Sequence, residues 1–262
     1  QKQTLFPMDL VPLQWSEFHA SGYKIPVSGV VYPGEKPATC GMPLGGLDTG
    51  CIDLGTTGLL GFVTSFNSLS PRRGPLNEPF LGLRLGKKTY VLAGSGMVGV
   101  GAAQQMYYWG HYPVADIEYE LDCPLGVGVR AWSPFIPGDV DSSMIPGAVF
   151  EVHLRNLSAE MQDGRLAMTF AGCERHYTAI YRKPLSYGAF SGAYAGHGKP
   201  ERPMSKEASY ALGVIGDMPV YLDYHFGWDA SAWQRMGDRT VPPMQKDDDN
   251  SGMSVAVDFS LE

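Results

Sequence analysis

The feature that most constrains the fold is a two-residue alternation between apolar and polar side chains. It is clearest in residues 253–261, where five large apolar side chains alternate with small or polar ones. A β-strand places successive side chains on opposite faces, so this pattern is typical of a half-buried strand. Similar alternation occurs in residues 150–154, 166–170 and 220–226. The chain is therefore predicted to be rich in antiparallel β-sheet.

Turn-forming residues separate these predicted strands. The 262 residues include 33 Gly and 20 Pro, spread along the whole chain. The run Gly86-Lys87-Lys88 lies between two apolar segments and is typical of a hairpin turn. Helical periodicity is rare, and the one helix that we predict is short, at residues 231–236.

The domain prediction follows from these patterns. We expect one all-β domain over residues 1–262, an antiparallel β-sandwich with long Gly/Pro-rich loops and at most short helices. Residues 1–24 form an N-terminal extension, and long loops are predicted at 184–206 and 238–252. The clean strand pattern at 253–261 stops one residue before the last residue given, so its sheet looks unfinished. A closing strand from beyond residue 262 or from another polypeptide is one explanation, and an edge strand is the other.

Charge and hydropathy exclude several classes of protein. With 20 basic and 27 acidic residues, the formal net charge is −7, which disfavours nucleic acid as a partner. No apolar run approaches the roughly 18 residues of a membrane-spanning helix. The chain begins at Gln1 without an initiator Met, as an exported protein does after cleavage of its signal peptide. We therefore expect an extracellular or periplasmic location, with a cytoplasmic one left open.

The four cysteines, Cys40, Cys51, Cys123 and Cys173, lack the spacing of a zinc site. Two disulfides are allowed, with three connectivities.

Acidic residues occupy alternate positions in the segment 116–122. Asp116, Glu118, Glu120 and Asp122 would share one face of a strand, with neighbouring carboxyls about 6 to 7 Å apart. That spacing is close to the separation of the two carboxyls in an inverting glycosidase. Catalytic pairs normally come from different elements, however, so we favour a solvent-facing row of acids.

A second acidic pattern resembles a calcium loop. Asp247, Asp249 and Ser251 precede Gly252, so alternate oxygens would point inward around a sharp turn. The alternative is a polar acidic loop, because the segment that follows is a predicted strand and not a helix. No cofactor is required by any pattern in the chain, and calcium at these three residues is the one metal that we consider.

Aromatic residues cluster at 107–112. Tyr107, Tyr108, Trp109 and Tyr112 would stack on sugar rings if exposed, or pack in a core if buried. The six histidines show no metal-binding spacing, and no catalytic constellation is apparent from the residues alone.

Two segments resemble a known enzyme family. Residues 43–52 read Pro-Leu-Gly-Gly-Leu-Asp-Thr-Gly-Cys-Ile. Within 113–156, Trp-Ser-Pro-Phe-Ile-Pro-Gly-Asp at 132–139 is followed by Asp-Ser-Ser and then by Pro-Gly-Ala-Val-Phe-Glu-Val at 146–152. The order and spacing resemble the N-terminal domain of the β-glucosidase and glucosylceramidase family, glycoside hydrolase family 116. One departure is Asp48, where the family usually has glycine.

The resemblance implies a β-sandwich that precedes an α/α-barrel catalytic part. In such enzymes a Glu nucleophile and an Asp acid/base lie in the helical part, so no catalytic residue is expected in this chain. The implied function is that of the non-catalytic part of a retaining β-glycosidase, which packs on the barrel and shapes the cleft for a carbohydrate or glycolipid. The alternative is a free-standing exported protein that binds glycans or serves a structural role.

Candidate substrate-binding residues under either reading are Tyr108, Trp109 and Asp48. For the matched segment we predict that Phe135 and Phe150 are buried at the centre of the sandwich, with Trp132 at least partly buried.

Overall fold

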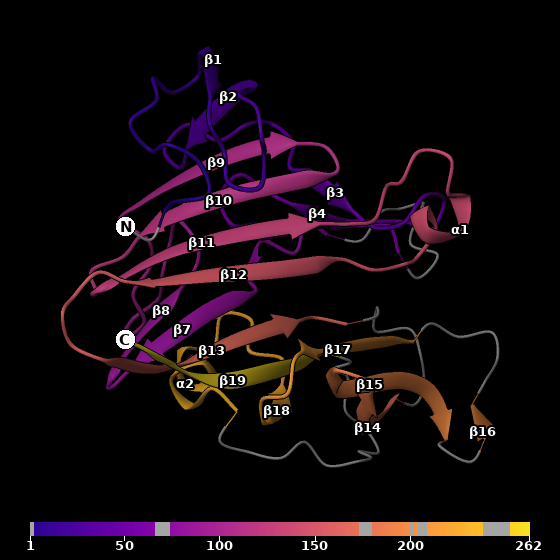
Figure 1. The fold of residues 1–262 in the computed structure, drawn as a ribbon. Helices are drawn as coiled ribbons and strands as arrows, with labels where there is room; N and C mark the ends of the chain where they lie inside the picture. Colours follow the sequence, from indigo (N-terminus) through magenta and orange to yellow (C-terminus); the bar gives the residue numbers. More distant parts are fainter. Residues whose placement is uncertain (1–2, 66–73, 173–179, 200–201, 204–208, 238–251) are drawn as a thin grey trace.

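The computed structural model describes residues 3–65, 74–172, 180–199, 202–203, 209–237 and 252–262 (Figure 1). Its regular structure is antiparallel β-sheet, and the described residues contain only two short helices, α1 (Val140–Ser143) and α2 (Ala230–Arg235). The predicted all-β class is confirmed. The helix predicted at 231–236 is α2.

The largest sheet has six strands in the order β1-β2-β9-β10-β11-β12. These are β1 (Trp15–Phe18), β2 (Val27–Pro33), β9 (Gln105–His111), β10 (Val114–Glu120), β11 (Leu125–Trp132) and β12 (Val149–Asn156). The N-terminal residues pack on its outer face, where Leu5, Phe6 and Phe18 form a small core with Val31 and Trp109.

A five-stranded sheet forms the second layer, in the order β18-β19-β13-β7-β8. Its strands are β7 (Leu81–Leu85), β8 (Lys88–Val91), β13 (Gln162–Phe170), β18 (Val220–Tyr224) and β19 (Met253–Leu261). The hairpin predicted around Gly86 joins β7 to β8.

The final strand, β19, is an interior strand for half of its length. It pairs with β13 along all nine residues and with β18 along 253–257. Val255 and Val257 are buried, and Phe259 is half-buried against the core. The predicted inward face and pairing of this strand are confirmed, and both neighbouring strands come from the same chain.

Two smaller sheets complete the fold. One contains β3 (Met42–Leu44), β4 (Ile52–Leu54), β5 (Leu59–Val63) and β6 (Glu78–Pro79). The other contains β14 (Ile180–Tyr187), β15 (Phe190–Lys199), β16 (Arg202–Pro203) and β17 (Tyr210–Ile215). The prediction of a long loop at 184–206 is therefore wrong, because β14 and β15 form a hairpin there.

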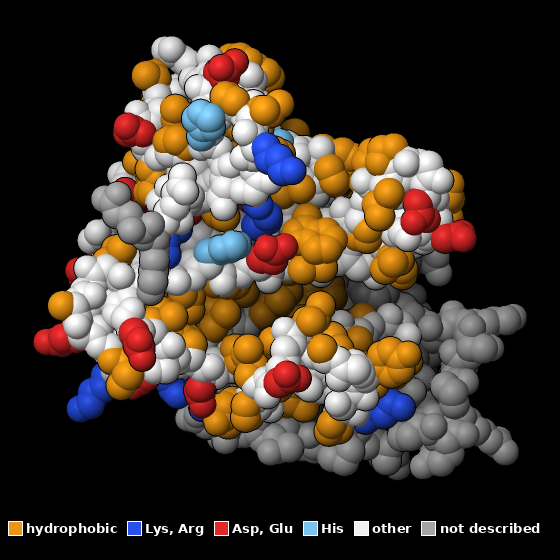
Figure 2. All heavy atoms as spheres, in the orientation of Figure 1, with side chains coloured by type: hydrophobic (Ala, Val, Ile, Leu, Met, Phe, Trp, Pro, Cys, Tyr) orange, Lys and Arg blue, Asp and Glu red, His pale blue; other side chains and the backbone are white. Residues whose placement is uncertain are grey.

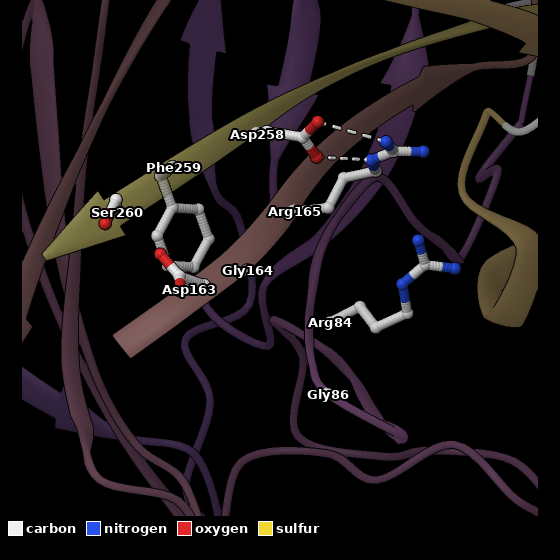
Figure 3. A pocket seen from close by; sticks show the side chains of 8 residues that line it. All are labelled: Arg84, Gly86, Asp163, Gly164, Arg165, Asp258, Phe259 and Ser260. Carbon is white, nitrogen blue, oxygen red and sulfur yellow. Dashed lines mark hydrogen bonds and ion pairs between the residues drawn. The ribbon is translucent and has the colours of Figure 1, made fainter. Parts of the chain in front are cut away.

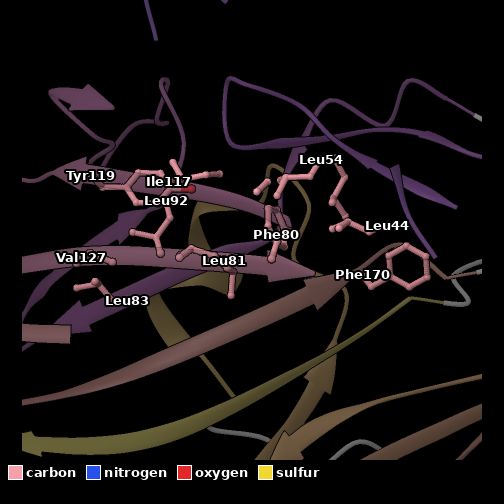
Figure 4. Close-up of a cluster of buried hydrophobic side chains, with 14 of the residues drawn as sticks. Leu44, Leu54, Phe80, Leu81, Leu83, Leu92, Ile117, Tyr119, Val127 and Phe170 are labelled. Carbon is pink, nitrogen blue, oxygen red and sulfur yellow. The ribbon is translucent and has the colours of Figure 1, made fainter. Parts of the chain in front are cut away.

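The main core lies between the two large sheets. Ile117, Tyr119 and Val127 of the six-stranded sheet meet Leu81 and Leu83 of the five-stranded sheet (Figure 4). Leucines from the small sheet β3-β6 close one end of this core.

Helix α2 packs on the outer face of the five-stranded sheet. Gly82, Ala167 and Ala256 lie directly opposite one another on three neighbouring strands. Their small side chains form a trough, and a Cβ on Gly82 would lie 2.6 Å from the Trp233 ring. Trp233 is fully buried above the trough, and its indole N–H donates to the Gly227 carbonyl at 2.9 Å.

Candidate functional site

Two loops that are distant in sequence meet at one end of the molecule. The Leu47 N–H donates to the Ser143 carbonyl oxygen at 2.7 Å. A Cβ at Gly46 would lie 2.4 Å from the Ile145 carbonyl oxygen, so only glycine permits this approach. The segments 43–52 and 132–152, singled out above as motifs, therefore form one structural unit.

Ser143 is buried and holds the second loop through hydrogen bonds. Its hydroxyl donates to the Asp139 carbonyl at 2.7 Å and accepts the Ile136 N–H at 2.8 Å. Asp139 caps α1 by accepting the hydroxyl and the backbone N–H of Ser142. These hydrogen bonds lower the pKa of Asp139, which is fully exposed.

Asp48 lies exposed in the first loop with a φ of 60°. This left-handed conformation favours glycine and is tolerated by aspartate better than by most residues. The conformation explains why glycine suits this position and why this chain can have an aspartate there. Of the three candidate substrate-binding residues, Asp48 is the one with a side chain at the surface.

Seven large apolar side chains are exposed around the two loops. We call them the apolar end surface: Leu47, Tyr112, Phe135, Ile136, Val140, Met144 and Ile145. Tyr112 and Phe135 are in ring contact, with centroids 5.6 Å apart. Figure 2 shows apolar side chains gathered around α1.

The predicted burial of Phe135 is wrong, since it is 41% exposed. Phe150 is half-buried and packs on Phe80, with ring centroids 5.0 Å apart, and Trp132 is half-buried as predicted.

A cavity of about 310 Å³ opens beside these loops, between the two layers. Its apolar wall includes Leu44, Ile52, Phe150, Phe170 and Leu212. Thr49 and Cys51 add polar atoms at the motif side. The cavity is thus mostly apolar, with polar groups from the first motif loop and from Ser65, Ser209 and Tyr210.

Tyr108 and Trp109 lie inside the molecule. Trp109 is 1% exposed and sits between Phe18, with ring centroids 4.9 Å apart, and His111, which stacks on it at 3.7 Å. Tyr108 is 4% exposed, and burial raises the pKa of its phenol. Neither ring presents a face to a sugar in this arrangement, which matches the core-packing alternative.

Asp116 is buried within a cluster of polar groups. Arg130 donates two hydrogen bonds to its carboxylate, at 2.7 and 2.8 Å, and His111 Nε2 lies 3.2 Å from it. Burial raises the pKa of Asp116, but the hydrogen bonds from Arg130 and His111 outweigh burial and hold the pKa below its ordinary value. The carboxylate is therefore ionised and fully engaged.

Glu118 is also completely buried. Its carboxylate accepts the Leu5 N–H at 2.6 Å and forms a two-point ion pair with Arg155. The prediction of a solvent-facing acidic row is wrong for Asp116 and Glu118, because the N-terminal residues cover this part of the sheet. It holds for Glu120 and Asp122, which are exposed.

One sequence signal pointed to the buried pair. A Cβ at Gly128 would lie 2.7 Å from Glu118 Oε1, and one at Gly126 would lie 2.9 Å from Arg155 Nε. Alternating glycines on β11 thus leave space for an ion pair above the sheet. Glycines at i and i+2 in a predicted strand beside alternating acids are the pattern to look for.

A shallow hollow of about 510 Å³ lies on the outer face of the five-stranded sheet (Figure 3). Arg165 forms a two-point ion pair with Asp258, and its guanidinium lies 3.8 Å from the centre of the Tyr221 ring. Arg84 donates to the Gln234 and Arg235 carbonyls at the end of α2. The Arg84 contacts attach α2 to the sheet, and the Arg165 contacts link β13 to β18 and β19, so both arginines have a structural role.

No group of three His, Cys, Asp or Glu that could hold a metal occurs among the described residues. Asp247, Asp249 and Ser251, the predicted calcium ligands, lie outside them. Cys40 and Cys123 are free thiols, so the two-disulfide arrangement is not formed.

Comparison with known proteins decides the family. The sequence model of a family described as "beta-glucosidase 2, glycosyl-hydrolase family 116 N-term" matches residues 41–179. The match covers more than half of the chain and includes both motif loops. The chain belongs to this family.

A search of the curated proteins found no match. In this family 116 N-terminal domain, the matched region contains both motif loops, the buried ion pairs of β10 and the strand β12. None of the described helices is long and apolar enough to cross a membrane.

Proposed function

We propose that this chain is the non-catalytic part of a retaining β-glycosidase and acts with an α/α-barrel catalytic part. Membership of the family 116 N-terminal family supports this role. The two buried carboxylates of β10 support it as well, because both are engaged by arginines and hydrogen-bond donors. A retaining mechanism needs two available carboxyls about 5 to 5.5 Å apart.

The apolar end surface is the proposed contact with the catalytic part. Seven exposed large apolar side chains, six on the two adjoining loops and Tyr112 on the β9–β10 turn, are the single observation that carries this assignment. Contiguous exposed apolar surface marks interaction sites in soluble proteins. The loops are held by Gly46, Ser143 and the α1 cap, so the surface is preformed.

The substrate is proposed to be a carbohydrate or glycolipid, bound by the catalytic part in a cleft that this domain helps to shape. Asp48, exposed beside Leu47, is the residue that we place at the rim of that cleft. We further propose that residues 1–262 act as one domain. We also propose an extracellular or periplasmic location for the chain.

The test is to express the chain alone and together with an α/α-barrel catalytic polypeptide of family 116. We expect the chain alone to release no aryl alcohol from an aryl β-glucoside, and the pair to co-elute in size-exclusion chromatography and to turn the substrate over. Turnover by the pure chain that is lost on Asp116→Asn would overturn the proposal. Separate elution of the two polypeptides would support the free-standing alternative.

A further inference from the structure

The six-stranded sheet ends in a long free edge. Among the described strands, β12 pairs with β11 along all eight residues and is the last strand on that side. Natural edge strands are commonly short or carry Pro or Lys, which prevents pairing with another chain. The opposite edge, β1, has four residues, whereas β12 has eight and contains neither Pro nor Lys. This edge therefore lacks two of the common protections against pairing.

The inward row of β12 is incompletely covered. Phe150, Val152 and Leu154 pack against the main core, yet each remains half-exposed. Figure 2 shows a hollow between the two layers with apolar side chains at its floor. A further strand along β12 would place its own apolar side chains over this row.

The outward row carries a carboxylate and an imidazole two residues apart. The side chains of Glu151 and His153 are 46% and 40% exposed. Glu151 accepts the Trp132 indole N–H at 2.6 Å. Among the described residues, His153 Nε2 has no hydrogen-bond partner, and the Glu151 carboxylate lies 3.7 Å away.

The strand is complementary to itself when a second copy runs antiparallel about Val152. In this register Glu151 faces His153 of the second copy, and His153 faces its Glu151, so two carboxylate–imidazole pairs form on the outward face. On the inward face Phe150 faces Leu154, and Val152 faces Val152. Centring the pairing on Glu151 would place the two Glu151 carboxylates opposite each other. Centring it on His153 would place the two imidazoles opposite each other and Glu151 opposite Arg155, whose guanidinium is already held by Glu118. The register about Val152 is the one in which Glu151 and His153 both face a complementary side chain while the Arg155–Glu118 ion pair stays intact.

We propose that this domain forms a twofold-symmetric dimer through antiparallel pairing of β12 with β12 of a second copy. The two six-stranded sheets then form one continuous sheet, and the half-exposed apolar row becomes buried. This interface is separate from the apolar end surface, so dimer formation and binding of a catalytic part are tested independently.

A charge exchange tests the register. The chain of 28.5 kDa should have twice that mass by light scattering. His153→Glu places two carboxylates opposite each other at both pairs and should raise the dissociation constant by about tenfold or more. Glu151→Lys should weaken the dimer similarly, in part through loss of the Trp132 hydrogen bond. The double variant, which carries both substitutions, places a lysine opposite a glutamate at both pairs and should regain the dimer.

Lys88→Glu is the matched control, because it changes charge in the same direction on an exposed residue of β8, at another sheet edge. It should leave the mass unchanged. Amide exchange in 149–156 should be slow in the wild-type dimer and fast in His153→Glu. A monomeric wild type with fast exchange there would overturn the proposal, as would a dimer that His153→Glu leaves intact. A double variant that stays monomeric while each variant unfolds like the wild type would also overturn it.

Discussion

Ion pairs with arginine give two acidic residues of β10 a structural role. Asp116 and Glu118 lie on one face of the strand, as two catalytic carboxyls could. Each is engaged by an arginine, however: Arg130 pairs with Asp116, and Arg155 pairs with Glu118. Removing one partner of such a buried pair leaves an uncompensated charge, so we expect loss of either partner to destabilise the sheet. The same residues are thereby unavailable for proton transfer to a substrate.

The depressed pKa of Asp116 predicts a specific loss of stability in acid. A carboxyl whose pKa is lower in the folded state contributes stability above its unfolded pKa, about 3.9. That contribution disappears as the pH falls through the folded pKa. We therefore expect the difference in unfolding free energy between wild type and Asp116→Asn to shrink as the pH falls below about 4. Urea denaturation at a series of pH values measures this difference.

Asp122→Asn is the control for this experiment, since Asp122 lies in the same row but is exposed. It should unfold like the wild type at neutral pH. A wild-type to Asp116→Asn difference that stays constant down to the acid transition would contradict the role assigned to the Arg130 contact.

At the scale of elements, the fold depends on matching large side chains with small ones across strands. Trp233 of α2 requires Gly82, Ala167 and Ala256 beneath it. Asp229 holds the start of this short helix by accepting the backbone N–H groups of Ser231 and Ala232. A hydrogen bond from the Ser231 hydroxyl, at 2.7 Å, lowers the pKa of Asp229.

Gly82→Ala should displace the Trp233 ring and lower the unfolding free energy by about 1–3 kcal/mol, as expected for overpacking. Thermal or urea unfolding followed by tryptophan fluorescence measures this change. Gly94→Ala is the matched control, because the closest atom to its added Cβ is an ordinary 3.6 Å away. Equal stability of the Gly82 and Gly94 variants would show that α2 does not rest on the trough as described.

Alternation of large apolar residues predicted β12, β13, β18 and β19, because each has one face on the core. It missed the hairpin of β14 and β15, where the buried positions of β15 are filled by small residues such as Ala193 and Ala195. Without large side chains, the two-residue period is invisible in the sequence. Glycine and serine in that segment looked like loop residues for the same reason.

At the scale of the whole molecule, the family motifs form one end of the domain. The sequence placed the motifs at 43–52 and 132–152 but could not show that Leu47 and Ser143 are hydrogen-bonded partners. Phe135 was expected inside because it is a large aromatic in a matched segment. The loop turns it outward instead, where it joins the apolar end surface. Exposure of such a residue depends on the tertiary path of the loop, which local patterns do not encode.

Contact between the apolar end surface and the catalytic part is tested most directly by affinity. The affinity of variant chains for an α/α-barrel catalytic polypeptide of family 116 can be measured by titration calorimetry. Phe135→Asp and Ile145→Asp each put a charge into the apolar end surface and should weaken binding by about tenfold or more while leaving the unfolding midpoint unchanged. Val98→Asp, at a residue 97% exposed on another loop, should bind like the wild type. Wild-type affinity in both surface variants would contradict the assignment of the apolar end surface as the contact with the catalytic part.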